Sequence, residues 1–204
     1  DTFLLGIAPP GGLIPAAWDP AIRRAVRDHG MNLVNGLHDR LSPRFPGLPQ
    51  GQWVWDIRTE PPGLGTSLGR AAALSARRLL LVGTDMAVGK MTAGLEIHSE
   101  AARQGKLSAF VATGRIGMTI MGSGVPLDAV RIDFSAGAIE GECLKYPEAD
   151  VIVVEGQGSL VHPSSSATLP LLRGSMPTHL VMCCRAGQTS LVRLPERTIP
   201  PLPE

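Results

Sequence analysis

The stretch that decides the fold spans residues 81–92 and reads Leu81-Val82-Gly83-Thr84-Asp85-Met86-Ala87-Val88-Gly89-Lys90-Met91-Thr92. It joins an apolar run over 79–82, which predicts a buried strand, to a helical pattern over 90–104 that Gly105 ends. A glycine-containing turn at such a junction directs backbone N–H groups and the positive end of the helix dipole at one anion. Gly89 lets the backbone approach a ligand closely, and Lys90 adds an ammonium that can reach a terminal phosphate. The stretch therefore predicts a phosphate-binding loop, with these candidate cofactor contacts: Gly83, Thr84, Asp85, Ala87, Val88, Gly89, Lys90, Met91 and Thr92.

Two positions of this loop depart from the standard pattern G-x-x-x-x-G-K-[ST]. Gly83 stands one residue early, so Thr84 occupies the place of the first glycine, and Met91 replaces the hydroxyl residue that would hold magnesium. Because a hard cation needs oxygen ligands, the loop predicts phosphate binding more firmly than magnesium binding. The alternative is a strand-to-helix turn with a surface lysine, which the spacing and the flanking elements disfavour.

Apolar runs alternate with helical patterns along the chain. Strands are predicted over 3–8, 32–35, 53–57, 79–82, 107–112, 151–154 and 179–183. Helices are predicted from Pro20 to Gly30 with Asp19 as N-cap, and over 67–77, 90–104 and 135–144, while the Pro-rich stretch 194–204 predicts an extended surface segment. Continuous apolar runs are typical of a parallel sheet that is buried on both faces. We therefore expect an α/β fold with one domain over 1–68 and a P-loop, parallel-sheet domain over 69–204.

Three further side chains stand where a phosphate ligand could meet them. Glu155 ends the apolar run 151–154, so it can hold a metal ion beside the phosphates, or it is an ordinary carboxylate of a surface loop. Arg115 follows the run 107–112 and either binds a phosphate or carboxylate or is solvated. His162 is either a general base or a structural histidine. The candidate catalytic residues are thus Lys90, Glu155 and His162, with Arg115 as a cofactor contact and Thr92 and Glu155 as ligands if magnesium is used.

Composition excludes several other classes of protein. The 204 residues are 44% hydrophobic and only 18% charged, unlike a disordered chain, and a net charge of +1 with 4% aromatic residues argues against a nucleic-acid partner. No apolar stretch approaches 18 residues, so we expect no membrane span. Three cysteines without a CxxC pair favour a reducing cytoplasm over a disulfide framework or a zinc site. We expect a cytoplasmic protein with a small-molecule substrate, and leave open whether it forms homo-oligomers.

The motifs resemble known families at two levels. Gly83-Thr84-Asp85 with Val88-Gly89-Lys90 is similar to the phosphate loop of dethiobiotin synthetase and MinD-like proteins, and Val154-Glu155-Gly156 resembles the magnesium-binding strand end of that synthetase. A longer set of strings, spread over nearly the whole chain, resembles the domain-of-unknown-function 1611 family. This set comprises the loop itself, Pro9-Pro10-Gly11-Gly12, Gly36-Leu37-His38-Asp39, Phe110 to Gly114, Gly124-Val125-Pro126, and Val154 to Leu160 with His162-Pro163.

This resemblance implies an N-terminal Rossmann-like domain followed by a P-loop domain, with Met91 as a family trait. Members of the family are longer at both ends, so we expect this chain to be part of a longer protein. Some members are D-glutamate N-acetyltransferases, which implies acetyl-CoA as donor, CoA phosphates on the loop, and Lys90 as an electrostatic anchor. The alternative that dethiobiotin synthetase suggests is an ATP- and magnesium-dependent ligase or kinase acting on a small carboxylate. The third hypothesis is a MinD-like module that binds a partner under the control of a nucleotide.

Overall fold

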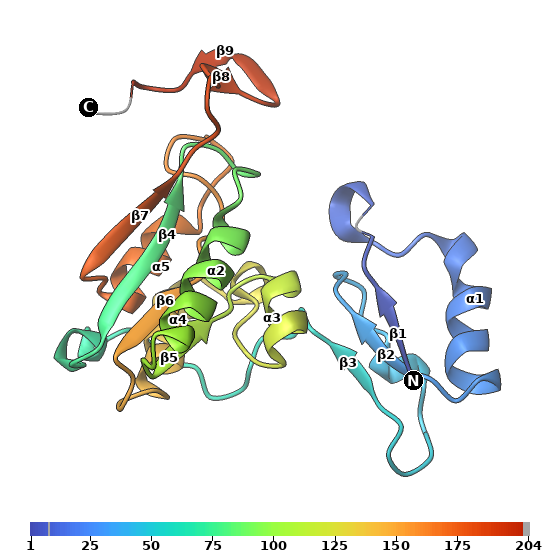
Figure 1. Ribbon diagram of the computed structural model, residues 1–204. Helices are drawn as coiled ribbons and strands as arrows, with labels where there is room; N and C mark the ends of the chain where they lie inside the picture. Colours follow the sequence, from blue (N-terminus) through green and yellow to red (C-terminus); the bar gives the residue numbers. More distant parts are fainter. Residues whose placement is uncertain (8, 202–204) are drawn as a thin grey trace.

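The computed structural model describes residues 1–7 and 9–201 and has two parallel β-sheets, each with its own core (Figure 1). The N-terminal sheet has the order β1-β2-β3, formed by Thr2–Leu5, Asn32–Asn35 and Val54–Asp56. Helix α1 (Asp19–Arg23), continued by a π-helical turn over Arg24–Asp28, packs Ile22 and Val26 against Leu33 of this sheet. This is the β-α-β arrangement that the alternation of sequence patterns predicts.

The second sheet is also parallel and has the order β5-β6-β4-β7, made of Ser108–Val111, Val151–Val154, Arg77–Gly83 and His179–Cys183. Helices cover both faces: α2 (Lys90–Arg103) and α3 (Arg115–Met121) on one, α4 (Ile132–Leu144) and α5 (Thr168–Ser175) on the other. Leu80 and Val82 belong to the core under α4 and α5, whereas Leu81 between them belongs to the core under α2. Burial on both faces explains why these strands are continuous apolar runs, as expected.

Several boundaries differ from the sequence prediction. Strand β1 ends at Leu5 rather than at residue 8, which lies outside the described residues. Asp19 is not the N-cap of α1: it lies in the first turn, and its carboxylate accepts a hydrogen bond from Arg23 Nε at 2.6 Å. The predicted helix over 67–77 is wrong, because only a 3₁₀ turn over Arg70–Ala73 forms there and β4 begins at Arg77. Helices α3 and α5 and a C-terminal hairpin are additional elements.

Glu140 explains why the segment before β4 is extended rather than helical. Its carboxylate is fully buried on α4 and accepts hydrogen bonds from the N–H groups of Leu68 and Arg70 at 3.1 and 2.8 Å. The Ser67 hydroxyl and Arg70 Nε also donate to it, at 3.0 and 2.9 Å. In a helix, these backbone N–H groups would donate to carbonyl oxygens of the same segment. Here the Glu140 carboxylate accepts from them instead. The segment between the domains is therefore fastened to α4.

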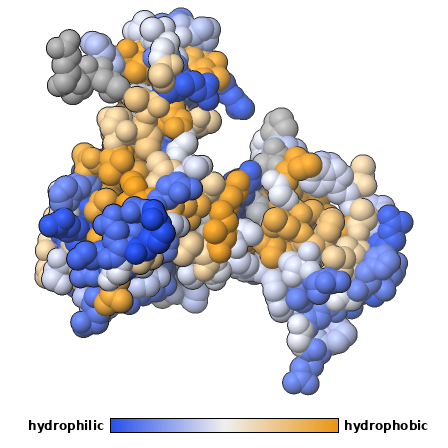
Figure 2. Space-filling model, in the orientation of Figure 1, coloured by the Kyte–Doolittle hydropathy of each residue, from blue (hydrophilic) through white to orange (hydrophobic). Residues whose placement is uncertain are grey.

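The C-terminal hairpin pairs β8 (Ser190–Leu191) with β9 (Leu194–Thr198) and stands above the ends of β4 and β7 (Figure 1). Asp85, at the end of β4, fastens it: the carboxylate accepts hydrogen bonds from Gln188 Nε2 at 2.7 Å and Val192 N at 2.9 Å. The hairpin includes the first part of the Pro-rich stretch, which is extended and largely exposed as predicted. Figure 2 shows an open notch between this hairpin and the N-terminal domain. No helix among the described residues has the length and apolarity needed to span a bilayer.

Replacing Glu140 by alanine is expected to lower the free energy of unfolding by about 3 kcal/mol, because partly buried N–H groups of the connecting segment lose a charged acceptor. Urea unfolding followed by far-UV circular dichroism measures the change, with the exposed Glu148→Gln as the control. Equal midpoints for Glu140→Ala and the control would show that the segment does not depend on this carboxylate.

Replacing Asp85 by asparagine is expected to loosen the hairpin by about 2 kcal/mol, because a charge-assisted acceptor is lost. Burial raises the pKa of Asp85, but hydrogen bonds from Val192, Met86 and Gln188 outweigh it, so the pKa lies below its usual value. The Asp85 carboxylate therefore stabilises the hairpin fully at pH values above its unfolded pKa of about 3.9. This stabilisation is lost as the pH falls through the lower pKa of the folded state. Hydrogen exchange at the Val192 amide reports both effects, with Asp28→Asn as the control. Unchanged protection in Asp85→Asn would contradict this role.

Candidate functional site

The loop between β4 and α2 is shaped by two glycines. Gly89 has φ of 91°, the left-handed conformation that glycine adopts without strain, and it turns the chain into the first residue of α2. A Cβ on Gly83 would lie 2.8 Å from Val88 Cγ2 and 3.0 Å from Lys90 Nζ. The early glycine, which departs from the standard pattern, is therefore required here because its missing side chain leaves room for the lysine.

Lys90 is buried beneath this loop rather than extended into solvent. It is 5% exposed, and its ammonium donates to the carbonyl oxygens of Asp85 and Met86, both at 2.9 Å. Its stem passes over Gly156, where a Cβ would lie 2.9 Å from Lys90 Cδ and would clash with the Leu81 carbonyl. Burial lowers the pKa of Lys90, against the opposing negative charge at Cys183 and Asp85. The charge is thus held at the carboxyl end of the sheet, where parallel α/β proteins bind ligands.

Backbone donors of the same loop are unused. Within residues 1–7 and 9–201, the N–H groups from Ala87 to Met91 donate to no protein acceptor, whereas Thr84 N and Met86 N are bonded to Cys183 O and Asp85 Oδ1. Consecutive free N–H groups beside a buried ammonium form a cradle that fits a phosphate. The structure therefore brings the predicted loop residues 83–92 together in one turn with free N–H groups, and the side chain of Thr92 is exposed outside it.

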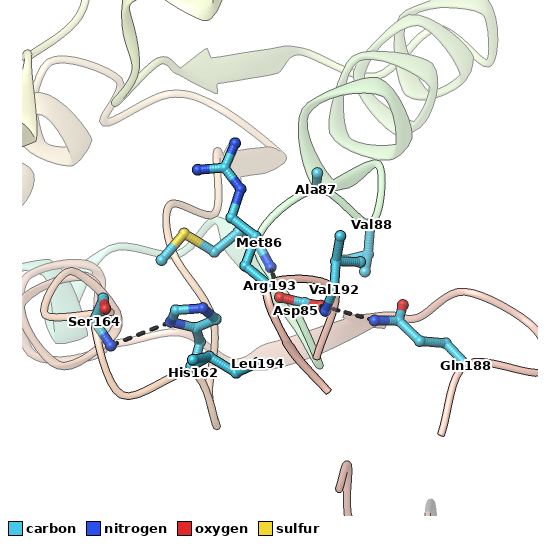
Figure 3. Close-up of a pocket in the computed structure, with 10 residues that line it drawn as sticks. All are labelled: Asp85, Met86, Ala87, Val88, His162, Ser164, Gln188, Val192, Arg193 and Leu194. Carbon is cyan, nitrogen blue, oxygen red and sulfur yellow. Dashed lines mark hydrogen bonds between the residues drawn. The ribbon is translucent and has the colours of Figure 1, made fainter. Parts of the chain in front are cut away.

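A cavity of about 460 Å³ opens beside the loop (Figure 3). It lies between the loop, the segment after β6 and the C-terminal hairpin, and its lining is Asp85, Met86, Ala87, Val88, His162, Ser164, Gln188, Val192, Arg193 and Leu194. A second cavity, of about 420 Å³, shares Met86 and Ser164 with the first and continues along Gln157 to Asp128. The second cavity thus reaches Asp128, which is ion-paired with Arg58 of the N-terminal domain.

His162, the candidate general base, lines the first cavity, and its ring has a defined tautomer. Ser164 N donates to His162 Nδ1 at 3.1 Å, so this nitrogen carries the lone pair and the proton of the neutral ring lies on Nε2 (Figure 3). A ring held in this way offers an N–H donor to the cavity rather than a free base. Its charge when protonated would face Asp85, whose pKa it lowers.

The structure places Glu155 away from the loop cavity. Its carboxylate is 6% exposed, and Oε2 accepts hydrogen bonds from Thr113 N at 2.8 Å and Gly114 N at 3.0 Å. The same oxygen lies against Gly117, where a Cβ would clash with the carboxylate. Burial raises the pKa of Glu155, partly offset by those two backbone donors. This carboxylate therefore positions the start of α3, a role that the strand-end pattern did not reveal.

The residues considered for magnesium do not fit a magnesium site in this structure. Met91 has no oxygen ligand to offer, Thr92 is exposed on α2, and the Glu155 carboxylate is committed to α3. In the part of the chain that the structure describes, no three His, Cys, Asp or Glu side chains gather as metal ligands. The predicted pairing of Thr92 with Glu155 is not formed here.

Arg115 is also separated from the loop cavity. Its side chain lies against Gly36 of the N-terminal domain, where a Cβ would be 3.0 Å from Arg115 Cδ. The structure instead adds residues that sequence reasoning missed: Gln188, Val192 and Arg193 of the hairpin line the cavity from a segment about a hundred residues after the loop. In the sequence, only Asp85, the acidic residue of the loop, could have indicated that a hydrogen-bond donor from a distant segment lies beside the loop.

Comparisons with known proteins agree with this architecture. A protein from Pseudoalteromonas sp. named D-glutamate N-acetyltransferase is 37% identical over 98% of this chain and 60% of its own length. A protein of the same name from Tritonibacter scottomollicae is 36% identical over 100% of this chain and 62% of its own length. The crystal structure of a DUF1611 family protein from Anabaena variabilis ATCC 29413 has a TM-score of 0.92 and 50% identity, over 98% of this chain and 59% of that one. The chain thus spans about 60% of the length of these relatives.

Two family models cover almost all of the chain. The domain of unknown function DUF1611_N, a Rossmann-like domain, matches residues 1–60, and DUF1611_C, a P-loop domain, matches residues 66–204. The two parallel sheets correspond to these two domains, and the anion cradle of the loop lies in the second. The chain belongs to the DUF1611 family, with an N-terminal Rossmann-like domain and a C-terminal P-loop domain.

Proposed function

We propose that this protein is an N-acetyltransferase that transfers the acetyl group of acetyl-CoA to the amine of D-glutamate. The observation that carries the proposal is the phosphate cradle: free N–H groups from Ala87 to Met91 above the buried ammonium of Lys90. It is supported by the names of two relatives, at 36% and 37% identity. The reaction needs a phosphate anchor but no magnesium, which agrees with Met91 in the place of the hydroxyl ligand.

The loop anchors CoA through charge and backbone donors. Binding a phosphate would move the Lys90 ammonium from the carbonyls of Asp85 and Met86 to phosphate oxygens, exchanging neutral acceptors for an anion. The cavity beside the loop, with the exposed side chain of Met86 at its border, then has room for the pantetheine arm. The thioester would lie near His162, whose Nε2–H is free to donate.

Acyl transfer then requires only a neutral amine and a stabilised oxyanion. The substrate nitrogen forms a bond to the acetyl carbon, the C–S bond breaks, the amine loses a proton to solvent, and the CoA thiolate takes one up. The N–H of His162 is suited to the thioester oxygen as negative charge develops on it, which assigns the residue as a donor rather than a base. Glu155 acts at a distance by holding α3 in place.

Lys90→Met is expected to weaken CoA binding about 10- to 100-fold while leaving the fold intact, because the apolar stem over Gly156 is kept and the charge is lost. Calorimetric titration with CoA measures the affinity, and thermal unfolding checks the fold. The exposed Lys106→Met is the matched control. An affinity equal to that of the control would exclude the loop as the CoA phosphate site.

The proposed reaction is expected to proceed in EDTA and without ATP, because the acetyl donor already carries the activated bond. Release of CoA thiol is followed with D-glutamate and L-glutamate as acceptors, and the product is identified by mass spectrometry. A reaction that depends on ATP and magnesium and forms ADP would contradict the proposal and favour the ligase or kinase alternative.

His162→Ala should reduce the turnover number about 100-fold with little change in CoA affinity.

A further inference from the structure

We propose that Arg58 and Arg115, one from each domain, form a binding site for a substrate carboxylate, with Asp128 beside it for the substrate amine. The site lies where Arg58, just after β3, meets Arg115 at the start of α3. Its assignment to an amino acid rests on the proposed function, whereas the anion site itself rests on the geometry alone.

Arg58 is an incompletely satisfied guanidinium between the domains. Its Nη2 is 2.9 Å from Asp128 Oδ2 and its Nη1 is 2.5 Å from His38 Nε2, while Nε is buried and has no partner among the described residues. Because Arg58 can only donate, His38 Nε2 accepts and that ring is neutral. Only 14% of the Arg58 side chain is exposed, so its charge is compensated by Asp128 and little else.

Arg115 brings a second positive charge to the same place. In the part of the chain that the structure describes, its guanidinium has no hydrogen bond or ion pair, although its stem packs on Gly36. Burial lowers the pKa of Arg115 first and the charge of Arg58 lowers it further, against the opposing effect of Asp128. Asp128 is paired with Arg58, so among the described residues the Arg115 guanidinium is left without a counterion.

Two glycines at this junction, Gly12 and Gly36, let side chains pack directly on the backbone. Gly12 has φ of 68°, and a Cβ there would lie 2.6 Å from His38 Cδ2 and 3.1 Å from Arg58 Nη1. Gly36 likewise makes room for the Arg115 stem. Loops that follow β1, β2 and β3 therefore converge on the arginine pair, and carboxyl ends of parallel strands are where α/β domains bind their ligands.

The position of Asp128 connects this pair to the proposed reaction. Asp128 lines the second cavity, which shares Met86 and Ser164 with the cavity beside the phosphate loop. An amino acid whose carboxylate met the planar forks of the arginines could donate a hydrogen bond from its neutral amine to Asp128, with the amine facing the acetyl donor. A phosphate is disfavoured as the ligand because the loop with Lys90 already supplies the phosphate site.

The test measures D-glutamate binding by calorimetry in Arg58→Gln and Arg115→Gln, with the exposed Arg103→Gln as the matched control. Each of the two variants should bind D-glutamate about 10- to 100-fold more weakly, with CoA affinity unchanged. Arg115→Gln should unfold at the same temperature as the unaltered protein or higher, because the guanidinium makes no hydrogen bond to any described residue and repels Arg58. Arg115→Lys, which keeps the charge without the fork, should lie between the two.

Malonate separates this site from the proposed function, because it is a dicarboxylate with no amine to acetylate. If D-glutamate is not acetylated but malonate binds and loses affinity in both variants, the anion site stands and the acetyltransferase assignment fails. If CoA or inorganic phosphate loses affinity in the variants while both carboxylates bind normally, the pair is a phosphate contact and the proposal is overturned. Binding of neither carboxylate to the unaltered protein, or equal affinities in all variants, also overturns it.

Discussion

The loop at the carboxyl end of the P-loop sheet is packed around one buried side chain, Lys90, whose ammonium lies beneath it. A charge is taken out of water only where dipoles replace the water, and here two loop carbonyls do so at 2.9 Å. That requirement shapes the neighbours: Gly83 and Gly156 have no side chain because the lysine occupies the space. The four helices and the alternating core residues in turn hold β4 and β6 at the spacing that this packing needs.

Asp85 shows how the same loop organises a distant segment. Its backbone carbonyl accepts from Lys90, while its carboxylate accepts from Gln188 and Val192 of the hairpin. One residue therefore couples the shape of the phosphate cradle to the wall of the cavity beside it. A ligand that draws the ammonium away from the carbonyl acts on a residue that also holds that wall.

The sequence predicts the strongly patterned parts of this molecule and misses those that depend on tertiary contacts. The strands β4 and β6 are visible as apolar runs, and the junction of β4 with α2 is visible because the run of β4 ends at Gly83. Helix α3 is not, because Gly117 weakens any local helical pattern, and the carboxylate of Glu155, forty residues away in sequence, holds the two N–H groups just before the helix. The predicted helix over 67–77 fails for the same kind of reason, since Glu140 takes its backbone donors. The roles of Glu155, Arg115 and His162 depend on side-chain directions that no spacing pattern contains.

The connection between the domains has a consequence for how a ligand would be captured. Glu60 is paired with Arg131 at 2.6 Å, Arg58 with Asp128, and residues 67–70 with Glu140, so the connecting segment is fixed at both ends. These contacts hold the N-terminal domain beside the P-loop domain in this structure. Each group that it contributes is present at a high effective concentration, and the entropy of bringing the domains together has been lost on folding instead of on binding.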